Sequence, residues 1–252
     1  MNKVNKGKMV VCYPVLYGNG MKYTATNIAH YYKQQHSECK VALVDFDFKI
    51  PYLGASFSLE DKVHGIDNLI EKIDGGFLNE ELFKENMTQL KNKVDLLKGT
   101  KLLKNFGLIE KRHVDRMIEI LKSLYDFIVV TVSPQVDNAG TVNALFHADD
   151  IVLIGRNNFS NLQMIPSAIK TVDHFKQKDA SIKMIFNMFN EQSNIDFSEC
   201  FNGYDVKVVG MIPYNESTID NGNLMRFGAG VTNKFFQSKK QNEYASIIEE
   251  FE

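Results

Sequence analysis

The sequence predicts an α/β domain with a doubly wound, mostly parallel sheet flanked by helices. Two observations lead to this prediction: short β-branched apolar runs alternate with longer amphipathic stretches, and the first run leads into a glycine-bearing turn. Strands that are apolar along their whole length are typical of a parallel sheet covered on both faces. Right-handed crossovers then place helices on both sides, and ligands of such sheets bind beyond the carboxyl ends of the strands.

Seven strands and seven helices are expected from these patterns. The strands are Met9–Tyr13, Val41–Val44, Val94–Leu97, Phe127–Val132, Ile151–Ile154, Ile182–Phe186 and Val206–Ile212. The helices lie near Tyr23–Gln34, Ile66–Ile73, Asn79–Met87, Glu110–Tyr125, Val136–Phe146, Leu162–Gln177 and Thr232–Phe251. The segment from Phe57 to Gly107 carries more charge and a weaker strand signal, so we expect helices and a short strand inserted within the same domain.

Composition indicates an ordinary globular protein. Of the 252 residues, 44% are hydrophobic and 24% are charged, with a formal net charge of −2, so no global charge points to nucleic acid or an anionic membrane. The three cysteines are isolated, which fits a reduced cytoplasmic setting. Neither a signal-peptide core nor an apolar run of about 18 residues is found, so we expect no membrane insertion. Because no repeat or Pro/Ser-rich linker interrupts the pattern, residues 1–252 are predicted to form a single domain.

The turn after the first strand has the arrangement of a phosphate-binding loop. Gly18 and Gly20 permit positive φ and a close backbone approach to a phosphate, and the helix that follows directs its N-terminal dipole at the same point. A plain strand-to-helix turn with two glycines accounts for this spacing equally well. The loop also departs from the usual G-x-x-x-x-G-K-[ST] spelling, because Lys22 follows Met21 and Tyr23 stands in the place of the metal-binding hydroxyl.

Polar residues follow several of the other predicted strands. Asp45 and Asp47 alternate at the end of the second strand and point to the same side, which suits Mg²⁺ binding or the positioning of an attacking water; turn formation is the alternative. Thr131 ends the fourth strand where nucleotide hydrolases often have an acid. Asn187 follows the sixth strand and can read the edge of an adenine ring, although a simple turn asparagine is favoured on chemistry alone. Pro213 fixes the exit of the seventh strand.

Taken together, these strand ends resemble the ParA/MinD family of deviant-Walker P-loop ATPases over nearly the whole chain. The matching segments are Asn27-Ile-Ala29, Val44-Asp-Phe-Asp47, Tyr125-Asp-Phe-Ile-Val-Val-Thr-Val-Ser-Pro134, Ala148-Asp-Asp-Ile-Val-Leu-Ile154, Asn187 and Gly210-Met-Ile-Pro213. The resemblance implies ATP and Mg²⁺ as cofactors and a homodimer. It assigns hydrolysis to Asp47 and the metal to Asp45, Tyr23 and Thr131. The cofactor-binding residues that it implies are Gly18, Asn19, Gly20, Met21, Lys22, Tyr23, Thr24, Asn187 and Pro213.

The loop departs from the family's Lys-Gly-Gly-x-Gly-Lys-Thr-Thr pattern in two alternative ways. An ungapped alignment through Asn27 places Leu16, Met21 and Lys22 at the signature lysine, the second lysine and the metal-binding threonine. A shift by one residue makes Lys22 the phosphate lysine and places Tyr23 at the threonine. In both alignments the signature lysine is absent, unless Lys49 or Lys22 serves by another route. Because losing one such group commonly costs about 10²–10³ in rate, we expect weakened nucleotide binding and slow or missing hydrolysis.

The resemblance implies a nucleotide-dependent positioning or partition protein, which acts in plasmid or chromosome segregation or in placing a cell-surface apparatus. Atypical loops are known in the TadZ/CpaE-like branch of the family. The alternative is a non-catalytic ParA-like scaffold that no longer binds nucleotide, whereas a phosphotransfer enzyme has little support. The acidic tail Glu243–Glu252 disfavours the membrane-binding helix of MinD-like proteins. The basic segment Lys234–Lys240 leaves non-specific DNA open as a partner, beside a protein partner.

Overall fold

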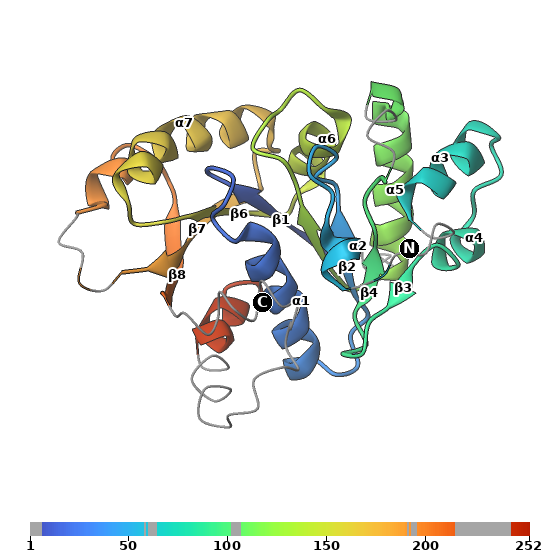
Figure 1. Ribbon diagram of the computed structural model, residues 1–252, viewed down its shortest axis with the longest axis horizontal. Helices are drawn as coiled ribbons and strands as arrows, with labels where there is room; N and C mark the ends of the chain where they lie inside the picture. The colour runs from blue at the N-terminus through green and yellow to red at the C-terminus, as the bar shows by residue number, and fades with distance from the viewer. Residues whose placement is uncertain are drawn as a thin grey trace.

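The structure is a computed structural model that describes residues 7–57, 59, 65–101, 107–190, 192, 196–214 and 243–252. Helices flank both faces of a twisted sheet in these residues (Figure 1). The sheet has the strand order β3-β4-β2-β5-β1-β6-β7-β8, and its pairs are parallel except for β3 with β4. The predicted fold class, a doubly wound and mostly parallel α/β sheet, is confirmed.

The predicted strands all form, with small shifts at their ends. They are β1 (Lys8–Pro14), β2 (Val41–Asp45), β4 (Asp95–Leu97), β5 (Phe127–Thr131), β6 (Asp150–Gly155), β7 (Ser181–Phe189) and β8 (Lys207–Pro213). The sequence did not predict β3 (Thr88–Gln89), because a two-residue antiparallel edge strand is too short to produce a periodic pattern.

The described helices agree with the predicted ones in most of the chain. They are α1 (Met21–Gln35), α2 (Leu53–Ser56), α3 (Ile66–Asp74), α4 (Glu80–Lys84), α5 (Lys111–Leu124), α6 (Ala139–His147), α7 (Phe159–Phe175) and the 3₁₀ helix η2 (Ser198–Phe201); residues 243–249 are also helical. The short helices α2 and η2 were not predicted. The helix expected over Asn79–Met87 is reduced to α4, and most of the one expected over Thr232–Phe251 lies outside the described residues.

Alternate residues of each strand pack on opposite faces of the sheet. In β1, Val10 and Cys12 pack with α1 and the C-terminal helix, whereas Met9 and Val11 pack on the face that α5, α6 and α7 cover. Figure 1 places the C-terminal helix beside α1, on the same side of the sheet. Because both faces are buried, a one-residue slip of any central strand would exchange the two cores, so the register is strongly determined.

This register brings the carboxyl ends of the central strands together at one edge. Thr131 at the end of β5 pairs with Asp45 of β2 on one side and with Cys12 of β1 on the other. Pro14 of β1 pairs with Ile154 near the end of β6. The polar residues that follow these strands are therefore neighbours in space. Within the described residues, no helix is both long enough and apolar enough to span a membrane.

Candidate functional site

The turn between β1 and α1 forms the centre of the candidate site. Gly18 and Gly20 both adopt the left-handed conformation, with φ of 82° and 72°. Gly20 is also the N-cap residue of α1, and among the described residues no side chain caps this helix. A Cβ atom on Gly20 would collide with the side-chain amide of Asn187, so this position needs glycine for space as well as for backbone conformation. Backbone N–H groups at the start of a helix have no acceptor within the helix itself, and an anion is a natural partner for such groups.

Two buried asparagines hold this loop in place. The side-chain Nδ2 of Asn19 donates to the carbonyl of Ile154 at 3.2 Å and to Oδ1 of Asn161 at 2.7 Å. The carbonyl of Asn19 accepts a hydrogen bond of 2.8 Å from Nδ2 of Asn187. The loop is thus tied to β6, α7 and β7 before any ligand arrives. Asn187 supports the loop backbone in this structure, and its contact with adenine stays a prediction.

The side chain of Lys22 extends from the first turn of α1 to the carboxyl end of β2. It is only 3% exposed, and its Nζ lies 3.2 Å from Oδ1 of Asp45 and 3.3 Å from Oδ2 of Asp47. The ammonium also donates to the carbonyl of Ile50 and lies 4.3 Å from the centre of the Tyr52 ring. Lys22, the predicted phosphate-binding lysine, thus lies beside Asp45 and Asp47, which were predicted to bind the metal ion and to position water. The contact of Lys22 with phosphate stays a prediction.

The other residues at the start of α1 do not share the contacts of Lys22 with the two carboxylates. Met21 belongs to the apolar cluster that α1 forms with the C-terminal helix, and Thr24 is fully buried. Tyr23 lies near Tyr244 of that helix, where burial first, and Tyr23 and Tyr31 in addition, raise the pKa of the Tyr244 hydroxyl. Both alignments of the loop stay predictions.

The Asp45 carboxylate is completely buried and accepts several hydrogen bonds. Its Oδ1 accepts from the hydroxyl of Thr131 at 2.9 Å, and its Oδ2 accepts from the backbone N–H of Leu53 at 3.0 Å. Burial raises the pKa of Asp45, and the nearby ammonium of Lys22 opposes that shift. Asp47 is also buried, and its Oδ1 accepts from the N–H of Ile50 at 3.1 Å.

This donor set fits Mg²⁺ poorly. Magnesium takes about six oxygen ligands at about 2.0–2.1 Å in near-octahedral geometry. Both oxygens of Asp45 already accept hydrogen bonds, and an ammonium lies between the two carboxylates. Among the residues that the structure describes, no group of three or more His, Cys, Asp or Glu side chains could hold a metal ion. The metal role of Asp45, Tyr23 and Thr131 stays a prediction that these contacts do not favour.

A cavity of about 480 Å³ lies at the carboxyl ends of β6, β7 and β8. Its walls carry exposed aromatic rings, Phe159 at 72% and Tyr214 at 50%, and an arginine whose buried Nε has no hydrogen-bond partner among the described residues. Aromatic and guanidinium groups of this kind stack well on planar rings. Single exposed residues leave no periodic signal in a sequence, so these residues were not predicted. The lining residues are Arg156, Asn157, Asn158, Phe159, Met188, Asn190 and Tyr214.

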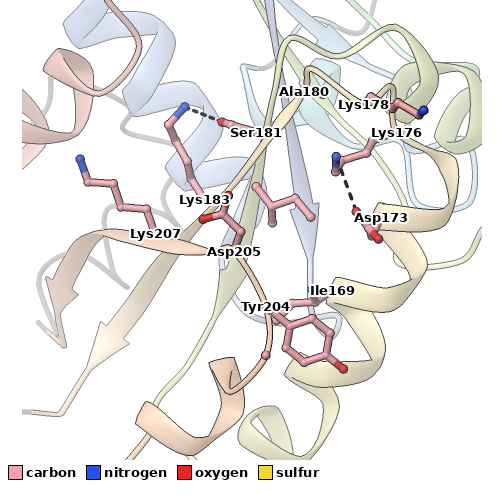
Figure 2. Close-up of a pocket in the computed structure, with 12 residues that line it drawn as sticks. Ile169, Asp173, Lys176, Lys178, Ala180, Ser181, Lys183, Tyr204, Asp205 and Lys207 are labelled. Atoms are coloured by element: carbon pink, nitrogen blue, oxygen red, sulfur yellow. Dashed lines mark hydrogen bonds and ion pairs between the residues drawn. The ribbon is translucent and has the colours of Figure 1, made fainter.

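A second cavity, of about 360 Å³, lies at the opposite edge of the sheet, near the first residues of β7 and β8 (Figure 2). Lysine side chains line it, but three of them already make ion pairs: Lys176 with Asp173 at 3.5 Å, Lys183 with Asp150, and Lys207 with Glu250 at 2.6 Å. Because acidic partners neutralise these cations, the cavity is a weaker candidate for an anion than the loop of α1.

A family model described as an AAA domain matches residues 15–186, from the loop to β7. The chain belongs to this AAA-domain family. No protein of curated function matches it. The solved structure of a ParA family ATPase from Chlorobium tepidum is similar to this AAA domain with a TM-score of 0.78 at 21% identity, covering 97% of this chain and 98% of that one.

Two further similar structures were solved with a nucleotide or a nucleotide analogue bound. A putative plasmid partition protein from Borrelia burgdorferi bound to AMPPNP has a TM-score of 0.69 at 17% identity, with 98% of each chain covered. The septum site-determining protein MinD from Pyrococcus horikoshii, complexed with Mg-ADP, has a TM-score of 0.69 at 18% identity, with 97% of this chain and 95% of that one covered. The predicted resemblance to the ParA/MinD-type P-loop family is confirmed, and the fold of this AAA domain is the ParA/MinD fold.

Proposed function

We propose that this AAA domain is an ATP-binding, ParA/MinD-like positioning or partition protein that forms a nucleotide-dependent dimer and hydrolyses ATP weakly or not at all. The observation that carries the proposal is the loop of Gly18 and Gly20. It opens an uncapped helix N-terminus at the edge where the central strands end, and buried hydrogen bonds hold it in shape. The nucleotide-bound ParA/MinD-like structures support ATP as the ligand class.

In this proposal the backbone N–H groups of residues 18–24 bind the phosphates. The base lies toward Asn187 and Pro213, next to the cavity that Phe159 and Tyr214 line. Hydrolysis is slow because Asp47, the predicted catalytic residue, contacts Lys22 and the N–H of Ile50 instead of being open to a water molecule.

An apolar rim around the loop supports a dimer or a protein partner at this edge. Tyr17, Ile50 and Tyr52 are 41%, 45% and 46% exposed, although they lie close to the buried Lys22 and Asp47. Exposed apolar residues that gather in one place often mark an interaction surface. The cargo in this proposal is a plasmid, a chromosome or a cell-surface apparatus. The basic segment Lys234–Lys240, which leaves DNA open as a partner, lies outside the described residues.

The test is calorimetric titration with AMPPNP, with the molecular mass measured by light scattering in parallel. Gly20→Ala should abolish binding, because the new methyl group displaces the loop or the Asn187 amide. Gly76→Ala is the matched control: Gly76 has a φ of 71° and open space around it, so this variant carries the same backbone strain away from the site. We expect binding and dimerisation in the wild type and in Gly76→Ala. Equal binding by Gly20→Ala would remove the loop from the proposal.

A second candidate function is a scaffold that keeps the fold without its nucleotide. The contacts of Lys22 favour it, because the cation of the loop is already engaged by two carboxylates and a carbonyl. A folded wild-type protein that gives no heat at millimolar AMPPNP would support the scaffold over the nucleotide-dependent dimer.

A further inference from the structure

The ammonium of Lys22 has a complete set of acceptors. An ammonium carries three N–H donors, and three oxygen-bearing groups surround this one: the carboxylate of Asp45, the carboxylate of Asp47 and the carbonyl of Ile50. The ring of Tyr52 covers it at 4.3 Å from the centroid. The contacts of Lys22 are thus those of a cation bound in a site, with two anionic ligands and one neutral oxygen.

The carboxylates of Asp45 and Asp47 likewise have hydrogen-bond donors from the chain in addition to the ammonium. Apart from Lys22, Asp45 accepts from the hydroxyl of Thr131 and from the backbone N–H groups of Asp47 and Leu53. Asp47 accepts from the N–H of Ile50. The pair therefore has a positive charge and hydrogen-bond donors supplied by the chain itself. Buried carboxylates need such compensation, and here they obtain it from α1 and from the segment that follows β2.

A divalent ion has no place in this arrangement. To reach the oxygens of Asp45 and Asp47 it would have to approach an ammonium that is 3.2 Å and 3.3 Å from those same carboxylates. At Asp45 it would also compete with the hydroxyl of Thr131 and with the backbone N–H of Leu53. Like charges at such a distance repel strongly where water is excluded.

We propose that the Lys22 ammonium is the resident cation of this site, in the place where a divalent metal ion would lie, and that nucleotide binding at the loop needs no divalent cation. The claim that nucleotide binding needs no divalent cation rests on the proposed function, whereas the claim that Lys22 is the resident cation does not. The ligand of the loop is then a metal-free nucleoside triphosphate, and the segment from Asp45 to Leu53 keeps its position whether or not a metal ion is available.

The claim that Lys22 is the resident cation is tested on the full chain without nucleotide, by titration with Mn²⁺ followed by electron paramagnetic resonance. The wild type should have no Mn²⁺ site that depends on Asp45. Lys22→Met should gain one, with an affinity increase of about tenfold or more, and Asp45→Asn added to it should remove the gain. Lys84→Met, which removes an exposed lysine from α4, is the matched control and should behave as the wild type does.

Two outcomes would overturn the resident cation. One is a wild-type Mn²⁺ site that Asp45→Asn abolishes, a comparison that does not require Lys22→Met to fold. The other is a folded Lys22→Met protein that gains no site at all, since the two carboxylates would then not be a cation site.

The claim that nucleotide binding needs no divalent cation is tested by AMPPNP titration of the wild type in Mg²⁺ and in EDTA. The two dissociation constants should agree within about twofold. A loss of about tenfold or more in EDTA would overturn metal-free binding. Absence of binding in both buffers would refute the proposed nucleotide function instead, and the Mn²⁺ titration would still decide whether Lys22 is the resident cation.

Discussion

Lys22→Met should strongly destabilise the fold, and the loss should depend on pH. Methionine keeps the length and most of the apolar stem of lysine, so the change removes mainly the ammonium. That ammonium is 3% exposed, and the side chains of its partners Asp45 and Asp47 are 0% and 2% exposed. The variant would leave two buried carboxylates without their cation.

The expected size follows from this burial. Breaking a buried ion pair by removal of one partner costs about 3–5 kcal/mol in the free energy of unfolding, because the remaining charge stays buried. No allowance for solvent screening is needed at 3% exposure. For a chain of this size, about 2–4 °C in Tm accompanies each kcal/mol, so Tm should fall by roughly 6–20 °C.

The pH dependence has a definite sign. Burial already raises the pKa of Asp45, and loss of Lys22 raises it further. An acid with a raised pKa in the folded state binds more protons there than in the unfolded state, so the free energy of unfolding falls as the pH rises toward that raised pKa. The variant should therefore be most destabilised, relative to the wild type, at neutral pH, and the difference should shrink toward acid.

Urea unfolding followed by circular dichroism, at about pH 7.5 and about pH 5.5, measures both effects. Lys111→Met is the matched control: its ion pair with Asp115 joins side chains that are 68% and 32% exposed, so its loss should cost no more than about 0.5 kcal/mol. A Lys22→Met protein as stable as the control, or one whose deficit grows toward acid, would refute the reasoning.

Three further predictions concern this edge of the sheet: two substitutions and the reactivity of one thiol. Thr131→Val, nearly the same shape, should cost about 1.5–3 kcal/mol in urea unfolding, because Asp45 loses a charge-assisted hydrogen bond of 2.9 Å; a loss below about 0.5 kcal/mol would mean that this bond contributes little. Asn19→Ala should cost about 1–3 kcal/mol and speed amide exchange in the loop, because Asn161 loses its 2.7 Å partner; unchanged exchange would show that the loop is held by other contacts. Cys12 should resist Ellman's reagent in the folded protein, since burial raises its thiol pKa to about 12; rapid modification would show that this strand opens.

Much of this fold is predictable because its signals are local. The central strands are apolar on both faces, and glycine is the residue that readily adopts the left-handed conformation found at Gly18 and Gly20. The alternation of Asp45 and Asp47 likewise predicts that they lie on the same side, and both contact Lys22 although β2 ends at Asp45. The edge strand β3 could not be predicted, because two residues carry no period and their pairing depends on β4.

The sequence by itself determined the layers, the strand ends and the glycine loop, since short-range backbone preferences and alternation of burial set them. Only the tertiary structure decided what the polar side chains at this edge contact. Lys22 reaches a carboxylate 23 residues away, and Asn187 holds a carbonyl 168 residues away, so neither contact leaves a local pattern. A flexible lysine side chain takes the direction in which the fold has placed buried negative charge, and that charge meets it only after β2 and α1 have packed side by side.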